Sequence, residues 1–491
     1  MPENIEVYKK DEVYMKVVCD RGAAMEISDN FTFEVPGAKF MPEVRNKMWD
    51  GKIRLFNVNK NQLYVGLLSH LKEFCESRDY NLIVHDGLDE TADVPLNLLE
   101  EYLNKCKYNI MDHQLRAVAH AIRNHRALIL SPTASGKSFI IFSIIRFYKK
   151  VLNDPKVLIV VPTTSLVSQM NTDFIDYSQG CKAYSTHLIM SGQAKDCDNS
   201  EIFISTWQSI YKQPKKWFDQ FDVVIGDEAH LFKARSLVSI MEKLTDCKYR
   251  FGFTGTLDGT KTNKLVLEGL FGKVMKVINT KELIDKDILS SFKIKCLCLK
   301  YATEECKEVS KMKYQDEMDF LVNHVKRNSF IKNLTLTRTG NTLLLYQYVE
   351  KHGEVLYKAI KAEAEEGRKV FFVSGKTDTD TREAIRAATE KEDNAIIVAS
   401  YGTYSTGINI KNLHNVIFAS PSKSRVRNLQ SIGRGLRKGD NKDSATLYDI
   451  SDNLAHKSKL NHTVKHYMER VKIYAEEGFE YKTYNIRLSS D

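Results

Sequence analysis

Several features typical of other protein classes are missing from this sequence of 491 residues. Its nine cysteines are scattered and include no Cys-x-x-Cys pair, so we expect neither a disulfide framework nor a zinc site. This pattern predicts a protein of a reducing compartment. No run of eighteen apolar residues occurs, and the polar start MPENIEVYKKDE lacks the apolar core of a signal peptide. No repeat of solenoid length and no low-complexity tract is visible. These absences predict a globular cytoplasmic protein without membrane contact.

The charge of the chain is modest and unevenly placed. Lys and Arg number 72 and Asp and Glu 63, a net charge of +9. Residues 1–95 contain 12 basic and 17 acidic side chains, a balance of −5, so the rest of the chain carries +14. A polyanionic partner is therefore expected to meet the later part of the chain.

The most informative segment is SPTASGKS, which follows the apolar run 127–130 and precedes a helix-compatible stretch, 139–148. A strand, a turn whose backbone NH groups point at a phosphate, and a helix form a phosphate-binding loop. Lys137 is predicted to reach the outer phosphates and Ser138 to coordinate Mg²⁺. The predicted ATP-contacting residues of this loop are Ser131, Pro132, Thr133, Ala134, Ser135, Gly136, Lys137 and Ser138. Ser131 departs from the common pattern, which has glycine there.

A second acidic motif supports nucleotide hydrolysis. Residues 222–226 read as a buried strand that ends in Asp227-Glu228-Ala229-His230. Acids at the carboxyl end of a parallel strand lie beside the phosphate loop. Asp227 is predicted to hold Mg²⁺, directly or through water, and Glu228 to accept a proton from the attacking water.

Short β-branched runs alternate with helix-period stretches from residue 127 onward, which predicts two parallel α/β sheets. The predicted strands are 127–130, 157–161, 202–205, 222–226 and 249–253 in a first set, and 293–299, 342–348, 369–373, 395–399, 415–419 and 445–450 in a second. Cys296 and Cys298 alternate as inward residues of the strand 293–299. A polar segment, 279–291, is the predicted linker.

The two ends of the chain read differently from its centre. Asp50-Gly51 between residues 47–49 and 52–56 predicts a hairpin, either purely structural or contacting nucleic acid through Trp49, Lys52 and Arg54. Residues 461–478 show apolar positions at helical spacing and end at a glycine, which predicts a helix.

The order of motifs resembles that of the superfamily two helicases of the Asp-Glu-Ala-His type, over residues 110–450. The resemblance implies two RecA-like domains in tandem that bind ATP and Mg²⁺ between them. It implies four parts: a small N-terminal α/β accessory domain at 1–95, which is a candidate for DNA binding, an ATP-binding domain at 96–285, a helicase C-terminal domain at 286–452 and a helical extension at 453–491. Gln114 is similar to the adenine-reading glutamine. Backbone-phosphate contacts are implied for Pro162, Thr163, Thr164, Gln169, Thr206 and Trp207, and coupling of hydrolysis to DNA binding for His230, Thr254, Gly255 and Thr256.

The second half of the site is implied by the same resemblance. Gln430 begins a segment, QSIGRGLR, in which Arg434 and Arg437 are expected to meet the γ-phosphate when the domains close. Such an arginine finger typically contributes ~10³ to 10⁵ in rate. The segment SYGTYSTGIN resembles the family motif that places Thr406 near nucleic acid and Gly407 near nucleotide. Asn409 replaces an aspartate found in some relatives.

Further segments resemble, within this superfamily, the phage recombination and fork-remodelling DNA helicases. They include WDGKIRL at 49–55, VSG at 373–375 and STGI at 405–408, and they imply nucleic-acid contacts at Ser374 and Gly375. The implied function is ATP-dependent remodelling of forked or branched DNA in recombination, repair and replication, including branch migration, fork regression and R-loop unwinding. Branched DNA, an RNA–DNA hybrid and single-strand-binding or recombination proteins are the implied partners, in the host cytoplasm if the protein is phage-encoded. An RNA helicase and an ATP-switched strand-annealing protein remain alternatives.

Overall fold

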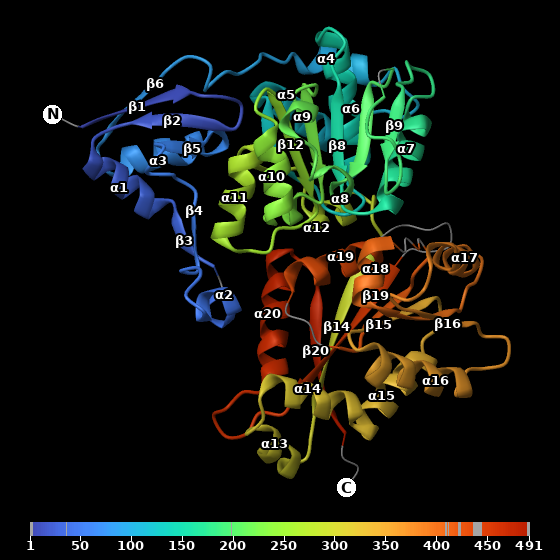
Figure 1. The fold of residues 1–491 in the computed structure, drawn as a ribbon. Helices are drawn as coiled ribbons and strands as arrows, with labels where there is room; N and C mark the ends of the chain where they lie inside the picture. Colours follow the sequence, from blue (N-terminus) through green and yellow to red (C-terminus); the bar gives the residue numbers. More distant parts are fainter. Residues whose placement is uncertain are drawn as a thin grey trace. The chain divides into compact units, whose positions relative to one another are not determined.

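The computed structural model describes residues 3–35, 37–197, 199–407, 410, 412–420, 424–435 and 444–488, with the backbone alone at 379, 405–407, 425–427, 434 and 435. The chain divides into two compact units, Met1–Val277 and Ile278–Asp491, each of which is described by itself (Figure 1). No helix in the described part of the chain has the length and apolar character needed to span a membrane.

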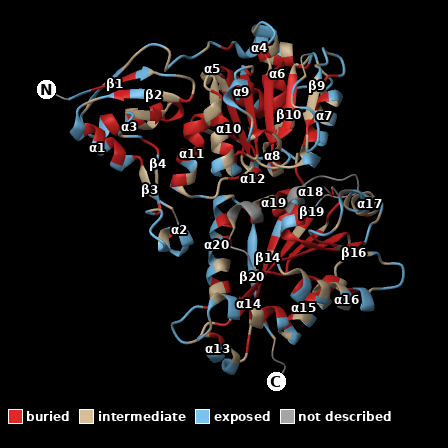
Figure 2. Cartoon of the chain, in the orientation of Figure 1, coloured by how far each residue is buried: buried red, intermediate tan, exposed pale blue. Residues whose placement is uncertain are grey.

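The first unit is centred on a seven-stranded parallel sheet in the order β13-β7-β12-β11-β8-β10-β9. Its strands are β7 (Arg126–Leu130), β8 (Val157–Val161), β9 (Thr186–Ile189), β10 (Ile202–Thr206), β11 (Val223–Asp227), β12 (Tyr249–Thr254) and β13 (Val274–Lys276). Its helices are α4 (Leu96–Leu103), α5 (Asp112–Asn124), α6 (Lys137–Val151), α7 (Thr164–Tyr177), α8 (Trp207–Ile210), α9 (Lys215–Phe218), α10 (Arg235–Lys243) and α11 (Lys261–Phe271). The central strands are buried on both faces, as their unbroken apolar runs require (Figure 2).

A smaller α/β layer precedes this sheet. Its four strands, in the order β5-β2-β1-β6, are β1 (Asn4–Lys9), β2 (Tyr14–Val18), β5 (Gln62–Tyr64) and β6 (Asn81–Val84). Helices α1 (Arg21–Asn30) and α3 (Leu68–Ser77) belong to the same layer (Figure 1). A separate two-stranded ribbon joins β3 (Thr32–Glu34) to β4 (Lys52–Arg54), and the short helix α2 (Pro42–Arg45) lies in the segment between them.

Polar contacts fix the small layer to the large sheet. The hydroxyls of Tyr14 and Tyr64 both donate to Glu242 Oε1 of α10, at 2.6 and 2.7 Å. His70 Nε2 lies 2.8 Å from Glu268 Oε2 of α11. A Cβ at Gly66 would overlap the backbone carbonyl of Glu268, so glycine permits this close approach. The N-terminal layer is therefore built into the first unit.

The second unit contains another seven-stranded parallel sheet, in the order β16-β17-β15-β18-β19-β14-β20. Its strands are β14 (Ser291–Lys300), β15 (Thr342–Tyr346), β16 (Val370–Val373), β17 (Ile396–Ser400), β18 (Asn415–Phe418), β19 (Ser444–Asn453) and β20 (Tyr481–Arg487). Its helices are α12 (Thr280–Asp285), α13 (Thr303–Val309), α14 (Tyr314–Asn323), α15 (Val325–Leu336), α16 (Glu354–Glu363), α17 (Thr379–Glu390), α18 (Tyr401–Gly407), α19 (Arg425–Gly435) and α20 (His462–Glu476).

The two predicted sets of strands are confirmed, with ends that differ by up to three residues. The strands β9, β13 and β20 are additional. The burial of Cys296 and Cys298 is confirmed, at 0% and 6% exposure, and so is the helix predicted at 461–478, as α20. The extension after residue 452 also supplies β20, which pairs with β14 at the edge of the sheet.

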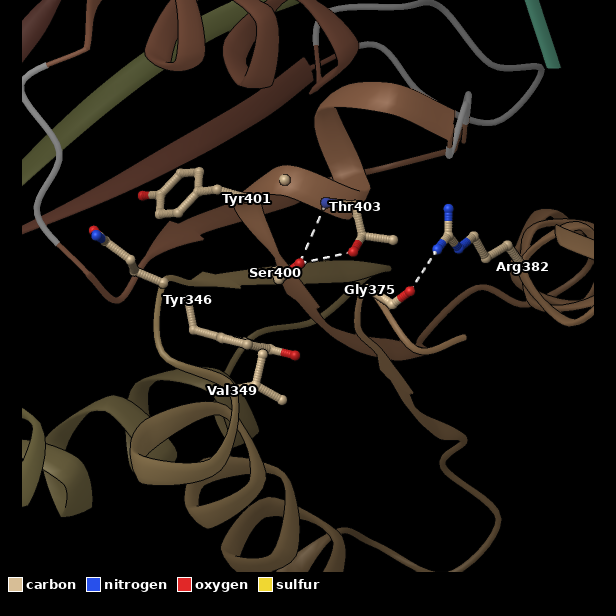
Figure 3. A pocket seen from close by; sticks show the side chains of 9 residues that line it. Tyr346, Val349, Gly375, Arg382, Ser400, Tyr401 and Thr403 are labelled. Atoms are coloured by element: carbon tan, nitrogen blue, oxygen red, sulfur yellow. Dashed lines mark hydrogen bonds between the residues drawn. The ribbon is translucent and has the colours of Figure 1, made fainter. Parts of the chain in front are cut away.

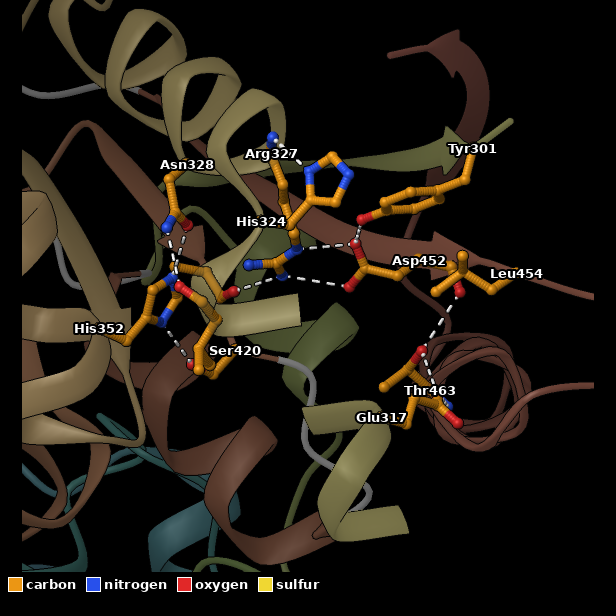
Figure 4. Close-up of polar contacts among 12 residues, drawn as sticks. Tyr301, Glu317, His324, Arg327, Asn328, His352, Ser420, Asp452, Leu454 and Thr463 are labelled. Carbon is orange, nitrogen blue, oxygen red and sulfur yellow. Dashed lines mark hydrogen bonds and ion pairs between the residues drawn. The ribbon is translucent and has the colours of Figure 1, made fainter. Parts of the chain in front are cut away.

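Buried polar groups join the layers of the second unit (Figure 4). Arg327 on α15 donates to both oxygens of Asp452, at 2.7 and 3.1 Å, and Tyr301 donates to the same carboxylate at 2.6 Å. Burial lowers the pKa of His352 to about 3, helped by the nearby Arg327 charge. The imidazole is therefore neutral at pH 7, and its Nε2 lies 3.2 Å from Asn328 Oδ1.

Two predictions are wrong. The Asp50-Gly51 hairpin does not form, because β4 pairs with β3 and the segment 47–49 instead turns back on the carbonyl of Glu43. Gly51 still adopts a left-handed conformation, with φ 77°, but it closes a longer loop. The expectation of no disulfide also fails, because Cys106 and Cys181 are bonded. The 75 residues between them give no local signal, and only packing of the segment after α4 against the end of α7 brings them together.

Candidate nucleotide and nucleic-acid sites

The predicted phosphate loop connects β7 to α6 in the first unit. Ala134 and Gly136 have φ values of 65° and 80°, a left-handed geometry typical of loops that turn their NH groups inward. Ser131 does not have a positive φ, so its position needs no glycine. Its hydroxyl is buried and pairs with that of Ser135, which also lies 2.7 Å from the carbonyl of Pro132. These contacts explain why the departure from the common pattern is compatible with the loop.

Gln114, predicted to read adenine, supports this loop from α5. Its Oε1 accepts from the backbone NH of Met111 at 3.0 Å, and its Nε2 donates to the carbonyl of Ser135 at 3.1 Å. The side chain is 5% exposed, and a Cβ at Gly136 would overlap Nε2. The amide therefore holds the loop in place, and its contact with a base stays a prediction.

The acidic pair lies at the carboxyl end of β11, facing the loop. Lys137 Nζ is 2.7 Å from Asp227 Oδ1 and 3.1 Å from Glu228 Oε1. Glu228 has a left-handed backbone, with φ 50°, which is uncommon outside glycine and asparagine. The structure thus brings the predicted lysine and both predicted carboxylates together.

Burial and charge act in opposite directions on these groups. Burial alone would raise the pKa of Glu228, but the Lys137 ammonium outweighs it and the pKa is lowered. Asp227 behaves differently, because burial and the neighbouring Glu228 charge raise its pKa despite Lys137. Burial would lower the pKa of Lys137, and the two carboxylates raise it instead. At neutral pH Glu228 is an ionised acceptor and Lys137 a cation.

A chain of contacts leads from the acids to the next strand. His230 Nδ1 lies 3.3 Å from Glu228 Oε2 and 3.0 Å from Thr254 Oγ1. The Thr254 hydroxyl donates to the carbonyl of Thr256, so His230 acts as the donor toward Thr254. The Thr254 carbonyl accepts from the NH of Ser131 at 2.9 Å, which returns the path to the phosphate loop. The predicted coupling residues are therefore in contact with the acidic motif and the loop.

The predicted backbone-contacting residues of the first unit gather at one sheet edge. Val161 and Thr206 are register partners at the carboxyl ends of β8 and β10. Pro162 and Thr163 follow the first strand, and Thr164 starts α7, where it is exposed, as is Gln169. Trp207 starts α8 and is half-buried. Trp217 is packed in the first unit, at 8% exposure, and its Nε1 donates to Asp196 at 2.8 Å.

Family models match three parts of the chain. The model described as "DNA helicase UvsW, N-terminal" matches residues 4–85, "Type III restriction enzyme, res subunit" matches 107–259, and "Helicase conserved C-terminal domain" matches 325–439. The chain is 34% identical to the ATP-dependent DNA helicase UvsW of Enterobacteria phage T4, over 98% of this chain and all of that one.

The chain belongs to the UvsW family of superfamily two helicases.

Other similarities agree with this assignment. The crystal structure of T4 UvsW covers 99% of this chain and all of that chain, at 33% identity and a TM-score of 0.52. The DNA 3′–5′ translocase XPB2 of Sulfurisphaera tokodaii is 26% identical over 72% of this chain and 85% of that protein. A DNA-bound Type ISP restriction-modification enzyme, LlaBIII, shares the fold at 15% identity and a TM-score of 0.57, covering 85% of this chain and 34% of that one.

The second unit of this UvsW-family chain has a pocket of about 440 Å³ at the carboxyl ends of its strands (Figure 3). It is lined by Tyr346, Gln347, Val349, Gly375, Arg382, Ser400, Tyr401, Gly402 and Thr403. Arg382 donates to the carbonyl of the predicted contact residue Gly375 at 3.4 Å. Ser374 lies at the same strand end, 5% exposed, and its Oγ accepts from the NH of Lys376.

Sequence reasoning did not include most of the residues that line this pocket among the site residues. Their common signal is position, because Gln347, Tyr401 and Thr403 each lie within a few residues of a strand's carboxyl end. The predicted Thr406 and Gly407 belong to α18, and Gln430 and Arg434 to α19, where Gln430 is half-buried. Arg437 and Asn409 lie outside the described residues.

Proposed function

We propose that this chain is an ATP-dependent DNA helicase that remodels forked and branched DNA. The observation that carries the proposal is Lys137 held between Asp227 and Glu228 in a UvsW-family chain. A lysine and two carboxylates at a phosphate loop fit nucleoside triphosphate hydrolysis better than simple binding, because the half-buried Glu228 is a proton acceptor that stays ionised.

The chemistry expected of the first unit follows from its donor set. Glu228 Oε2 lies 3.3 Å from His230 Nδ1, so the imidazole holds this carboxylate in place for a water molecule that it would deprotonate. Asp227 and Ser138 carry oxygen atoms of the kind that Mg²⁺ prefers and would hold that ion, which would supply positive charge against the phosphates. Lys137 exchanges its two carboxylate partners for phosphate oxygens, while Gln114 keeps the loop in shape.

The second unit supplies the remaining groups in this proposal. Arg434 and Arg437 would approach the γ-phosphate only when the domains close, with Gln430 beside them, so hydrolysis would depend on closure. The predicted contact residues after β8 and β10 in one unit, and the pocket at Gly375 and Arg382 in the other, would grip phosphates of the same strand in alternation.

The ribbon loop of the N-terminal layer is a candidate contact for the branch point. Phe40 and Met48 are each 74% exposed on this loop, which a stable monomer would not require. Lys39 Nζ lies 5.2 Å from the Phe40 ring, a cation and an aromatic face presented together. The Phe40 ring can stack on an unpaired base at a junction, with the Lys39 ammonium near the phosphates of that strand.

The test is the ATPase rate of the full chain on single-stranded, duplex, forked, four-way and RNA–DNA hybrid substrates at one salt concentration. We expect strong stimulation by DNA, greatest for the branched forms, and loss of strand separation with loss of hydrolysis. Equal rates with and without nucleic acid would refute a DNA helicase. Preferential unwinding of an RNA duplex would favour the RNA helicase alternative, and annealing activity that survives Glu228→Gln would favour the ATP-switched annealing protein.

A further inference from the structure

A basic and aromatic surface lies at the β20 edge of the second sheet. It consists of Lys293 and Lys295 on β14, Arg338 after α15, Tyr448 on β19, and Lys482 and Tyr484 on β20, and we call it the edge surface. Lys295 is the register partner of both Tyr448 and Lys482, so these side chains project from one face of the sheet. Lys293 and Tyr484 are two residues away along their strands and share that face.

The cations of the edge surface are ordered by aromatic rings. The Arg338 guanidinium lies 5.2 Å from the Tyr448 ring centroid, and its Nη1 donates to the Tyr448 hydroxyl at 2.9 Å. Lys295 Nζ lies 5.6 Å from the same ring. Lys482 Nζ lies 5.5 Å from the ring of Tyr484, which is 37% exposed. The surface therefore presents positive charge beside an accessible tyrosine face.

No carboxylate neutralises this charge in the part of the chain that the structure describes. Lys293, Lys295, Arg338 and Lys482 form no ion pair there, although Glu480 precedes Lys482 by two positions.

Some other exposed lysines of the same unit are paired, whereas Lys358 and Lys361 on α16 form no described ion pair. Lys351 lies 3.0 Å from Asp319, and Lys369 lies 2.6 Å from Glu392. Basic groups gathered without a carboxylate repel one another and are complementary to an anionic partner.

The edge surface is separate from the pocket at Gly375. Going from β20 to β15 crosses four strand spacings, ~19 Å at the usual distance between neighbouring strands. Lys293 is in register, through β19 and β18, with Thr342, the first residue of β15, whereas the pocket follows the carboxyl end of that strand. The edge surface and the pocket therefore lie on different strands and at different positions along the sheet.

We propose that the edge surface binds the phosphate backbone of a second arm of the DNA substrate, with a base stacked on Tyr484. The proposal rests on the proposed function, since it needs a substrate with more than one arm. Lysine on an edge strand also prevents strand pairing between molecules, which would account for Lys482. It does not account for Lys295 or Arg338, which lie inward of the edge on β14 and after α15.

The test compares two charge-reversed variants of the full chain. The edge variant carries Lys293→Glu and Lys482→Glu, and the control carries Lys358→Glu and Lys361→Glu on α16, which are exposed and form no described ion pair. Binding of a labelled four-way junction is followed by fluorescence anisotropy as salt is raised. We expect the edge variant to bind about tenfold or more weakly, with a salt dependence reduced by about two phosphate contacts. The control and a Lys293→Arg, Lys482→Arg variant should match the unmodified chain.

A second measurement separates DNA binding at the edge surface from DNA binding at the predicted phosphate-contacting residues elsewhere in the chain. ATPase stimulated by a short single strand should be unchanged in the edge variant, and Tyr484→Ala should weaken junction binding about fivefold or more, by loss of one stacked base. Unchanged junction affinity in the edge variant, or an equal loss in the control, would overturn the proposal. The proposal would also be overturned if the unmodified chain bound polyglutamate and the edge variant lost that binding but kept its affinity for the junction. That result would identify the edge surface as a site for an acidic protein. Absence of DNA-stimulated ATPase in the unmodified chain would instead refute the proposed function.

Discussion

Replacing Gly136 by alanine tests whether Gln114 shapes the phosphate loop. The backbone at Gly136 has φ 80°, which an L-residue with a side chain adopts at a cost of about 1–2 kcal/mol. The added Cβ would also overlap Gln114 Nε2. Although a glutamine is flexible, this one is 5% exposed and hydrogen-bonded at both ends of its amide, to Met111 and Ser135, so it cannot move without losing those bonds.

The magnitude follows from these two contributions. Two displaced hydrogen bonds are worth about 1 kcal/mol each, which together with the left-handed strain gives about 3–4 kcal/mol. If the loop avoids this free-energy cost by changing shape, ATP affinity falls by about 100-fold or more, since every 1.4 kcal/mol corresponds to a factor of ten in affinity. If the loop holds its shape, the free energy of unfolding of the first unit falls instead.

The assay is a double-mutant cycle on ATP affinity, measured with a fluorescent analogue and accompanied by thermal unfolding. In a Gln114→Ala background the overlap is gone, so Gly136→Ala should then weaken affinity or stability only by the strain, about tenfold. Gly192→Ala is the matched control, because Gly192 has φ 82° and no atom within 4 Å of an added Cβ. An equal effect of Gly136→Ala in both backgrounds would refute a contact between the two residues.

Three further outcomes are expected. Lys137→Ala should lower DNA-stimulated ATPase at least about 100-fold, because it removes the cation that meets the phosphates, whereas Lys150→Ala at the end of α6 should leave the rate within about twofold in the same assay. Arg327→Ala should lower the free energy of unfolding, measured by urea denaturation, by about 3–5 kcal/mol, because it leaves the buried Asp452 carboxylate without its cation. Lys332→Ala on the same helix removes a more exposed ion pair and should lower the free energy of unfolding by under about 1 kcal/mol. Similar effects of the two substitutions would contradict the reasoning. The pKa of His352 is lowered to about 3, so its neutral form contributes its full stability above about pH 6.5. This stability is lost at about 1.4 kcal/mol per pH unit as the pH falls toward 3, because the unfolded chain binds the proton first. His352→Gln should therefore flatten the dependence of the free energy of unfolding on pH in that window.

The structure suggests how hydrolysis communicates with the DNA-facing residues of the first unit. Glu228, His230 and Thr254 form a continuous path from the acidic motif to the end of β12. The backbone of Thr254 holds Ser131 at the start of the phosphate loop. A change in the partners of Glu228 during hydrolysis would therefore reach both β12 and the loop through polar contacts of about 3 Å.

Local chemistry determined the parts of this protein that sequence reasoning predicted correctly. Short unbroken runs rich in β-branched residues, such as VLIVV at 157–161, are typical of strands buried on both faces, so the two parallel sheets could be predicted. Lys137, Asp227 and Glu228 were readable because a phosphate loop and a strand-end acidic pair must meet at the carboxyl edge of a parallel sheet. The exposed strand β20 gave no such signal, since its sequence YKTYNIR lacks an apolar face.

Contacts between distant segments decided the rest. The Cys106–Cys181 bond, the pairing of β4 with β3 and the two bonds of Gln114 all depend on which elements pack together, and no local propensity encodes that. The edge surface is the clearest case, because β14, β19 and β20 come from separate parts of the chain. Only the register of the sheet places their lysines and tyrosines on one face.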